Sequence, residues 1–253
     1  MTKIVLSGCN GRMGQVVTQL AAQAEDLQIV AGIDAVAEKK NDYPVYAHPL
    51  EYGGGADVAV DFSSASALEP LLSWAAEKKV PLVLCATGYS EEQLAHIREA
   101  AKKQPIFKSA NMSLGINLLM ELVKRAAAVL GTGYDVEIVE KHHNQKKDAP
   151  SGTALMLADA AREGLPYEPE YVYDRSGVRQ VRGKTEIGIS AVRGGTIPGE
   201  HSVYFAGTDE LIEFKHTVYS RQVFAAGALK AARFMAGVTA PGLYDMGDVL
   251  KAL

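Results

Sequence analysis

A polar run between residues 140 and 153 combines side chains suited to giving a proton to a small anionic molecule. Its chemically useful members are His142, His143, Lys146, Lys147, Ser151, Gly152 and Thr153. A histidine is the simplest proton donor near neutral pH, and a lysine can hold a carboxylate or hydrogen-bond to an imine nitrogen. If Ser151 caps a helix that begins at Gly152, the amides of that turn can also bind a carboxylate. The adjacent histidines suggest a metal site as an alternative, but no third ligand is evident, so we expect no metal.

A second set of residues has the spacing of a phosphate-binding loop. Residues 8–14 read Gly-Cys-Asn-Gly-Arg-Met-Gly, between an expected strand at 3–7 and an expected helix at 13–24. Asp34 lies 20 residues after Gly14, at the end of the next expected strand, where an acid bonds the ribose hydroxyls of a dinucleotide. The spacing alone is a weak signal, and a glycine-rich turn without a ligand is the alternative. In this context we expect a nicotinamide dinucleotide to contact Gly8, Cys9, Asn10, Gly11, Arg12, Met13 and Asp34.

Two further strand ends belong to the same expected site. Cys85-Ala86-Thr87-Gly88 follows the fourth expected strand, and Ser109-Ala110-Asn111-Met112 follows the fifth. Ligands of open parallel sheets bind at the carboxyl ends of strands, so we expect the nicotinamide ring near Cys85, Ala86, Thr87, Ser109, Ala110, Asn111 and Met112. No histidine or aspartate lies nearby in the sequence to activate Cys85, which favours packing or backbone contact over nucleophilic catalysis.

The residue after Asp34 bears on the choice of cofactor. It is Ala35 rather than Arg or Lys, so a ribose 2′-phosphate would meet the charge of Asp34 with no adjacent cation. Arg12, Lys39 and Lys40 are the alternative cations. We therefore expect NADH, or dual use of NADH and NADPH, over strict use of NADPH.

The elements that position these residues alternate between strand and helix in the first 110 residues. Strands are expected at 3–7, 28–33, 57–62, 81–85 and 106–109, and helices at 13–24, 65–78 and 90–103. Ser63 or Ser64 is the expected cap of the second helix, and Ser90 with Gln93 has capping-box spacing for the third. Trp74 is expected in the core. This alternation predicts an α/β fold with a Rossmann-like, doubly wound parallel sheet.

The pattern changes near residue 112. A helix is expected at 114–130, a strand at 134–140 and a helix at 152–162, followed by a long excursion at 165–183. Three strands are then expected at 185–192, 201–206 and 211–219, in a mixed or antiparallel sheet, and a helix capped by Ser220 runs to about Met235. The pattern does not decide which domain takes this last helix.

Composition excludes several classes of protein. The chain has 253 residues, 47% hydrophobic content and a formal net charge of -4, without the basic patch of a nucleic-acid binder. Its two cysteines, Cys9 and Cys85, are too few for a disulfide framework. No apolar stretch has membrane-spanning length and no signal peptide is evident, so we expect a cytoplasmic protein with no membrane or nucleic-acid partner.

The polar run also carries a resemblance. The segment 141–155, KHHNQKKDAPSGTAL, resembles the signature of the 4-hydroxy-tetrahydrodipicolinate reductase (dihydrodipicolinate reductase) family of lysine and diaminopimelate biosynthesis. The similarity covers nearly the whole chain. Its other blocks are GCNGRMG at 8–14, DFS at 61–63, CATG at 85–88, SANMSLGIN at 109–117, GGTIPGEH at 194–201, SRQVFAAGA at 220–228 and YDMGDVL at 244–250.

The resemblance implies a division of the chain and an activity. Residues 1–112 and 220–253 would form the dinucleotide-binding domain, and 113–219 a smaller α+β domain, with a mixed sheet, for substrate binding and tetramerisation. The activity would be reduction of 4-hydroxy-tetrahydrodipicolinate, a dicarboxylate, to tetrahydrodipicolinate, with hydride from NAD(P)H and loss of water. An enzyme of similar plan acting on another small imine or carbonyl compound, and a sensor that binds the dinucleotide without turnover, are the alternatives.

The resemblance also implies roles for single residues. His142 matches the proton donor and acceptor, Lys146 the second proton donor, and His143 a substrate contact, while Gly152 and Thr153 match the carboxylate-binding turn. The chain departs from the family where Cys85-Ala86 replaces the commoner Gly-Thr. Asn144 and Gln145 also replace residues that are more basic in some members. These changes bear on cofactor preference and rate rather than on the reaction.

Overall fold

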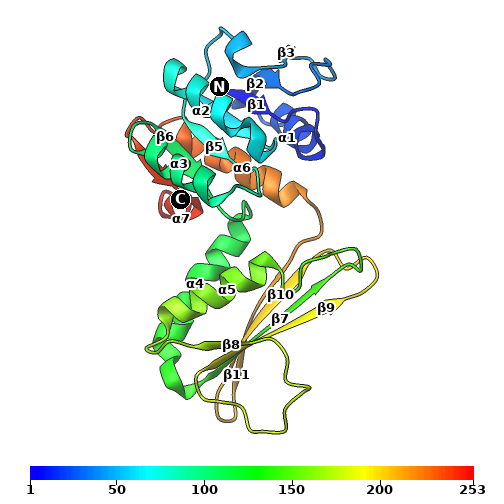
Figure 1. The fold of residues 1–253 in the computed structure, drawn as a ribbon, viewed down its shortest axis with the longest axis vertical. Coiled ribbons are helices and arrows are strands. Elements are labelled where there is room, and N and C mark those ends of the chain that lie inside the picture. Colours follow the sequence, from blue (N-terminus) through cyan, green and yellow to red (C-terminus); the bar gives the residue numbers. More distant parts are fainter. The chain divides into compact units, whose positions relative to one another are not determined.

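The computed structural model describes all 253 residues, which form two compact units (Figure 1). The first unit contains Met1–Leu114 and Arg221–Leu253, and the second contains Gly115–Ser220. The C-terminal segment thus belongs to the first unit. No helix is long and apolar enough to cross a lipid bilayer.

The first unit is built on a seven-stranded sheet in the order β12-β6-β5-β4-β1-β2-β3, with every neighbouring pair parallel. The strands are β1 (Thr2–Ser7), β2 (Leu27–Ile33), β3 (Val45–Tyr46), β4 (Val58–Asp61), β5 (Leu82–Leu84), β6 (Pro105–Lys108) and β12 (Gly242–Tyr244). The helices are α1 (Arg12–Ala22), α2 (Leu68–Lys78), α3 (Glu91–Ala101), α6 (Gln222–Met235) and α7 (Met246–Lys251). The expected doubly wound parallel sheet is confirmed.

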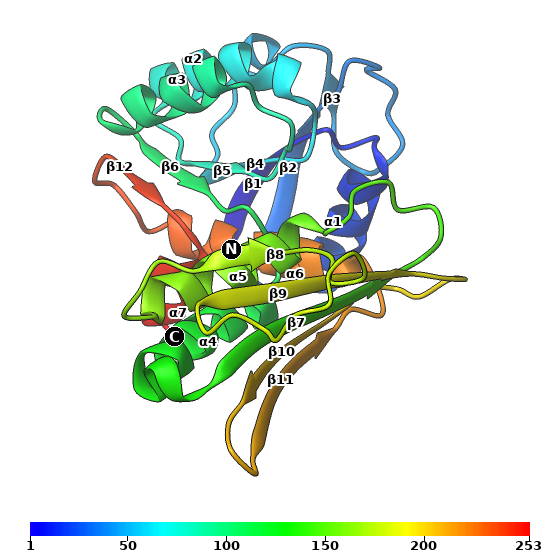
Figure 2. The same ribbon diagram turned by 60° about the horizontal axis from the view of Figure 1, so that its bottom comes forward.

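Strand periodicity divides the core of this unit into two layers. Along β1, Ile4 and Leu6 pack with α1 and α6, whereas Val5 packs with α2 and α3, because successive side chains point to opposite faces. Figure 2 shows α2 and α3 on one face of the sheet and α1 and α6 on the other. Trp74 is fully buried, as expected. Gly227 lets α6 approach closely, since a Cβ there would lie 1.7 Å from the carbonyl oxygen of Met112.

Helix starts were predicted with mixed success. Ser90 and Gln93 form the expected capping box of α3. The expectation of Ser63 or Ser64 as the cap of α2 is wrong. Its N-cap is Ala67, after a 3₁₀ turn at Ala65–Ala67, and the Ser63 hydroxyl instead bonds Asp61. Likewise, α6 has Arg221 rather than Ser220 at its N-cap.

The second unit has helices α4 (Leu114–Leu130) and α5 (Gly152–Gly164) and a five-stranded sheet in the order β11-β10-β7-β9-β8. Its strands are β7 (Asp135–His142), β8 (Glu170–Val172), β9 (Glu186–Arg193), β10 (Glu200–Ala206) and β11 (Leu211–Thr217). The pairs β7–β9 and β8–β9 are parallel and the others antiparallel, so the sheet is mixed, as expected. Val136 and Ile138 of β7 pack in one core with α4 and α5.

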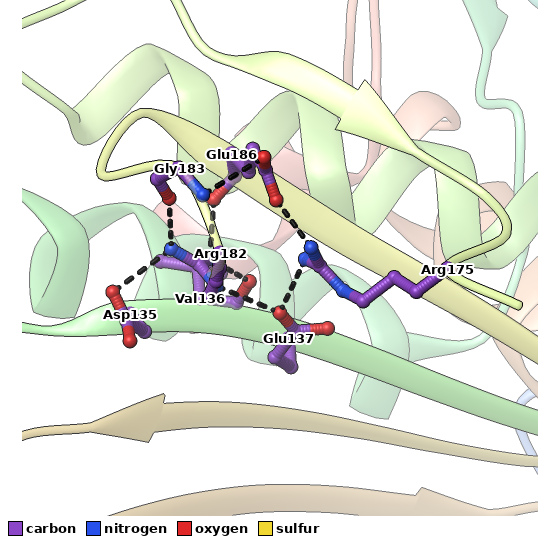
Figure 3. Close-up of polar contacts among 7 residues, drawn as sticks. All are labelled: Asp135, Val136, Glu137, Arg175, Arg182, Gly183 and Glu186. Carbon is purple, nitrogen blue, oxygen red and sulfur yellow. Dashed lines mark hydrogen bonds and ion pairs between the residues drawn. The ribbon is translucent and has the colours of Figure 1, made fainter. Parts of the chain in front are cut away.

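The expected long excursion at 165–183 is tied to the sheet of this unit. It contains β8, and charged side chains tie its later part to β7 (Figure 3). Arg182 donates to Asp135 at 2.8 Å and to Glu137 at 2.9 Å, and Arg175 donates to Glu137 at 3.0 Å and pairs with Glu186. These bonds hold the excursion against one edge and one face of the sheet.

Candidate active site

The glycine-rich loop between β1 and α1 has the geometry of an anion site. Gly8 has φ +74°, and a Cβ there would lie 2.7 Å from the backbone of Phe62 and Ser63. A Cβ at Gly14 would lie 2.2 Å from the carbonyl oxygen of Gly8, so this glycine lets α1 begin directly against the loop. The N-cap of α1 is Gly11, and no side chain caps the helix. The amides of its first turn are therefore available to a phosphate.

Asp34 lies next to this loop, at the end of β2. Its Oδ2 accepts a hydrogen bond from the Asn10 backbone amide at 3.0 Å, and its Oδ1 accepts one from the Val36 amide at 3.1 Å. The two bonds fix the carboxylate in one orientation and leave it further lone pairs. Cys9, by contrast, is fully buried against β2, so only its backbone can face a ligand.

The other predicted cofactor residues surround one cavity of about 400 Å³ in the first unit. Of the predicted residues, those lining it are Met13, Cys85, Ala86, Thr87, Ser109, Ala110, Asn111 and Met112. Phe62, Ser63 and Phe224 line it as well, although they were not predicted as cofactor contacts. The loops after β4, β5 and β6 thus converge at the carboxyl edge of the sheet, where a planar ring can lie against backbone.

Neither thiol near these loops is ionised at neutral pH. Burial raises the pKa of Cys85 well above its ordinary value, and the charge of Asp61 adds to the effect. Burial raises the pKa of Cys9 to about 11. A protonated thiol is a poor nucleophile, in keeping with a packing role for Cys85.

Asp61 is a buried acid that was named above only within the segment DFS at 61–63. Its carboxylate is fully buried and accepts hydrogen bonds from the backbone amide and hydroxyl of Ser63. The Tyr89 hydroxyl lies 3.5 Å from Asp61 Oδ2. Burial raises the pKa of Asp61, since these donors are neutral and offset only part of the desolvation. Asp61 therefore links the two loops that follow β4 and β5, through its contacts with Ser63 and Tyr89, and both loops line the cavity.

The second group of predicted residues lies in the other unit, at the end of β7. This strand continues to His142, so Glu140 and His142 share one face, two residues apart. The imidazole and the carboxylate meet through one short contact, with His142 Nδ1 2.6 Å from Glu140 Oε2. A carboxylate only accepts, so Nδ1 carries a proton, and Nε2 is the nitrogen that can exchange one with a ligand.

The register of the sheet supplies the partners of Glu140. Arg193 of β9 stands beside His142 and donates to both carboxylate oxygens of Glu140, at 2.7 and 2.6 Å. His201 of β10 is the direct cross-strand neighbour of Glu140, and its ring meets the His142 ring edge-on with centroids 5.0 Å apart. These residues are close in space although more than 50 positions separate them in the chain.

Glu140 also reaches the turn that begins α5. The Ser151 amide donates to Glu140 Oε1 at 3.0 Å, so one carboxylate contacts both His142 and the Ser-Gly-Thr turn. The Ser151 hydroxyl accepts from the Ala154 amide at 3.2 Å, which confirms Ser151 as the N-cap, and lies 2.9 Å from His201 Nε2. Together these contacts fix the position of the His142 imidazole relative to the turn at Ser151.

Lys146 lies in the loop between them, with its ammonium 2.8 Å from the Asp148 carboxylate. This ion pair holds the pKa of Asp148 below its ordinary value, so a carboxylate of the chain itself contacts the lysine that was predicted to act on the substrate. His143 is partly exposed beside His142, and Thr153 lies in the first turn of α5. The five predicted residues of this unit therefore gather at one end of β7 and α5.

Burial sets the protonation of these groups. It lowers the pKa of His142, an effect that the Glu140 carboxylate opposes, and it lowers the pKa of His201 to about 4. Burial works against the charged form of Glu140, but the hydrogen bonds from Arg193, His142 and the Ser151 amide outweigh it, and the pKa of Glu140 remains below its ordinary value. At neutral pH the site holds a carboxylate, a neutral His201 and a titratable His142.

Backbone conformation leaves Nε2 of His142 uncovered on one side. Gly199 has φ +144°, and a Cβ at this position would lie 3.3 Å from His142 Nε2. A glycine both permits this conformation and keeps the ring accessible. Throughout the chain, no group of three or more histidine, cysteine or acidic side chains is arranged to hold a metal ion.

Comparison with known proteins identifies the family. The model of the dihydrodipicolinate reductase N-terminus matches residues 2–112, and that of the C-terminus matches residues 115–250. The chain belongs to the dihydrodipicolinate reductase family. Dihydrodipicolinate reductases are NAD(P)H-dependent oxidoreductases of lysine biosynthesis, and this chain reduces 4-hydroxy-tetrahydrodipicolinate to tetrahydrodipicolinate with loss of water.

Individual members of the family resemble the chain over its whole length. The 4-hydroxy-tetrahydrodipicolinate reductase of Caldanaerobacter subterraneus subsp. tengcongensis is 53% identical, with 99% of each chain covered. The enzyme of Clostridium botulinum is 51% identical, with 99% of this chain and 98% of the relative covered. Among solved structures, the dipicolinate-bound dihydrodipicolinate reductase of Paenisporosarcina sp. TG-14 has a TM-score of 0.80 and 25% identity, with 97% of each chain covered.

Proposed function

We propose that His142 donates the proton that accompanies hydride addition to the substrate, with Lys146 as the second proton donor. The contact that carries this proposal is His142 with Glu140, at the end of β7 and beside the turn that begins α5. The buried carboxylate stabilises the charged imidazole and directs Nε2 away from Glu140. A nicotinamide cofactor supplies the hydride when bound. The residues of the chain orient the substrate and hold the proton.

The substrate is a dicarboxylate, and we infer that His143, Gly152 and Thr153 bind it together with Lys146. A carboxylate at the start of α5 meets backbone amides and the positive end of the helix, worth about 0.3–1 kcal/mol from the helix field. The ion pair of Asp148 with Lys146 supports this inference for the lysine, because its ammonium already holds a carboxylate of the chain. The Paenisporosarcina relative was solved with dipicolinate, a dicarboxylate of the same class.

For the dinucleotide, we propose that the uncapped start of α1 binds the pyrophosphate and that Asp34 binds the adenosine ribose. The nicotinamide would occupy the cavity of about 400 Å³ lined by the loops after β4, β5 and β6. Asp34 is followed by Ala35, with no cation on the neighbouring residue, which supports NADH as the preferred cofactor, or dual use with NADPH.

We also propose a homotetramer assembled through the second unit, acting in the cytoplasm. The sheet of that unit has helices on one face, and exposed apolar side chains such as Val192 and Leu211 support a partner on the rest of its surface. Light scattering coupled to gel filtration measures the mass, and a monomeric active enzyme would contradict this assembly.

A coupled assay tests the catalytic assignment. A synthase generates the unstable substrate, and oxidation of NADH and NADPH is followed separately. His142→Gln should lower kcat by about 10²–10⁴, the usual worth of a positioned proton donor. His96, an exposed histidine of the first unit paired with Glu69, is a matched control, and His96→Gln should retain activity. Near-normal turnover by the His142 variant would refute its assignment.

A further inference from the structure

Asn10 forms an unusual set of contacts for a residue of a phosphate-binding loop. Its carboxamide nitrogen donates to the carbonyl oxygen of Val36 at 2.8 Å and to that of Glu38 at 3.0 Å. Its backbone amide donates to Asp34 at 3.0 Å. One side chain in the loop thus uses both amide hydrogens to hold the backbone that follows β2.

The segment that Asn10 holds directly follows Asp34, the residue proposed to bind the ribose hydroxyls, and its Val36 amide donates to the Asp34 carboxylate. The turn is closed by the Glu38 amide, which donates to the Val36 carbonyl at 2.8 Å. The charged groups next along the chain are Glu38 and Lys40, whose side chains lie 3.6 Å apart. The carboxylate of Glu38 repels a phosphate, and the same carboxylate already offsets the positive charge of Lys40.

A 2′-phosphate has requirements that this arrangement does not meet. It carries close to two negative charges and needs hydrogen-bond donors or cations around it. Both amide hydrogens of Asn10 are used by carbonyls, and its Oδ1 is buried without a hydrogen-bond partner. Asn10 therefore has no free donor for a phosphate, and the atom that it leaves unpaired is an acceptor, which suits a donor hydroxyl of NADH better than the phosphate of NADPH.

We propose that Asn10 is a specificity-determining residue that disfavours NADPH by fixing the backbone of residues 36–38 beside Asp34. While that backbone is fixed, the chain that carries Glu38, Lys39 and Lys40 has less freedom to rearrange around a 2′-phosphate. The proposal rests on the proposed binding of the adenosine ribose by Asp34, and it assigns the discrimination to a residue of the phosphate loop rather than to the residues after Asp34 alone.

Binding titrations test this role without relying on turnover. The dissociation constants of NADH and NADPH are measured by dinucleotide fluorescence for the full-length wild-type enzyme, Asn10→Ala and Asn10→Gly. Loss of two hydrogen bonds should free the segment, and the ratio of the NADPH constant to the NADH constant should fall by about fivefold or more. The same ratio is then taken from kcat/KM in the coupled assay.

Gln15 provides the matched control. Its carboxamide donates to the Cys9 carbonyl at 2.8 Å, within the same loop, and none of its hydrogen bonds reaches residues 36–38. Gln15→Ala should weaken both dinucleotides by a similar factor and leave the ratio unchanged. Thermal melts of each variant show whether the fold is kept.

The outcomes separate this inference from the proposed function. A ratio that falls in the Asn10 variants but not in Gln15→Ala supports the inference, even if the wild-type enzyme turns out to favour NADPH and the proposed NADH preference fails. Equal weakening of both dinucleotides in the Asn10 variants overturns it, because Asn10 would then be a structural residue only. A wild-type enzyme that binds neither dinucleotide overturns both.

Discussion

Replacement of Glu140 by Gln should move the pH dependence of catalysis to lower pH. Glu140 is fully buried and contacts His142, Arg193 and the Ser151 amide. Glutamine keeps the shape of the side chain and removes its charge. Burial already lowers the pKa of His142, and the carboxylate is the group that raises it again. Without that charge the pKa of His142 should fall further.

The size of the effect follows from the contact it removes. A hydrogen bond between charged groups contributes about 1.5–3 kcal/mol, which corresponds to about 1–2 pKa units. Above its pKa, the protonated fraction of a proton donor falls about tenfold for each pH unit. Glu140→Gln should therefore lower kcat by about 10- to 100-fold at pH 8 and by much less in mild acid.

A second cost is expected in stability. Removing one partner of a buried ion pair costs about 3–5 kcal/mol when the remaining charge stays buried. The Arg193 side chain keeps 19% of its surface exposed and can regain water, so the cost should lie toward the lower end of this range. The assay is accordingly run well below the melting temperature of the variant.

The experiment compares pH profiles of kcat and kcat/KM, with the synthase in excess at every pH. Glu137→Gln is the matched control, because Glu137 lies on the opposite face of β7 and also pairs with arginines (Figure 3). It should lose some stability and keep the wild-type profile. If Glu140→Gln retains the wild-type rate and the wild-type decline at high pH, then the carboxylate does not set the protonation of His142.

Two further predictions concern neighbouring groups. Asp148→Asn should tighten dipicolinate binding by about threefold to tenfold, because the substitution removes a charged competitor for Lys146. Calorimetry measures the binding, and weaker binding by the variant would mean that Asp148 positions the lysine. Burial keeps His201 neutral, with a pKa of about 4 against 6.5 in the unfolded chain, so protons favour unfolding and stability is lost as pH falls through this interval. The loss is about 3 kcal/mol. Urea unfolding of His201→Asn should show a flatter pH dependence than wild type, and an equal slope would contradict this.

The first unit could be predicted from sequence because its signals are local. Each of the longer strands appears in the sequence as an apolar run, and each of the longer helices shows apolar residues at helical spacing. The glycine-rich loop lies between one such strand and one such helix. The elements that were missed, β3, β12 and α7, have two, three and six residues and too little pattern to detect. The strands β3 and β12 depend on pairing with β2 and β6 of a sheet that is already present, and α7 depends on packing in the same core as α6.

Only part of the site in the second unit could be predicted from sequence, for a different reason. The polar run gave His142, Lys146 and the turn at Ser151, because these lie within a few positions of each other. Arg193 and His201 lie on other strands, and only the register places them beside Glu140. One available signal was overlooked. Had the strand been continued from 140 to 142, its period of two would have put Glu140 and His142 on the same face.

The buried carboxylate of Glu140 explains how a buried histidine can serve as the proposed proton donor. A histidine buried to this extent loses its proton too readily to act as an acid at neutral pH, because burial disfavours the charged ring. A neighbouring carboxylate restores the charge, but such a carboxylate would itself take up a proton in the same surroundings. Arg193, which donates to both oxygens, prevents this by holding the pKa of Glu140 low. The proposed proton donor thus depends on an arginine that does not contact its Nε2, and the β7–β9 register that places this arginine contributes to the proposed chemistry.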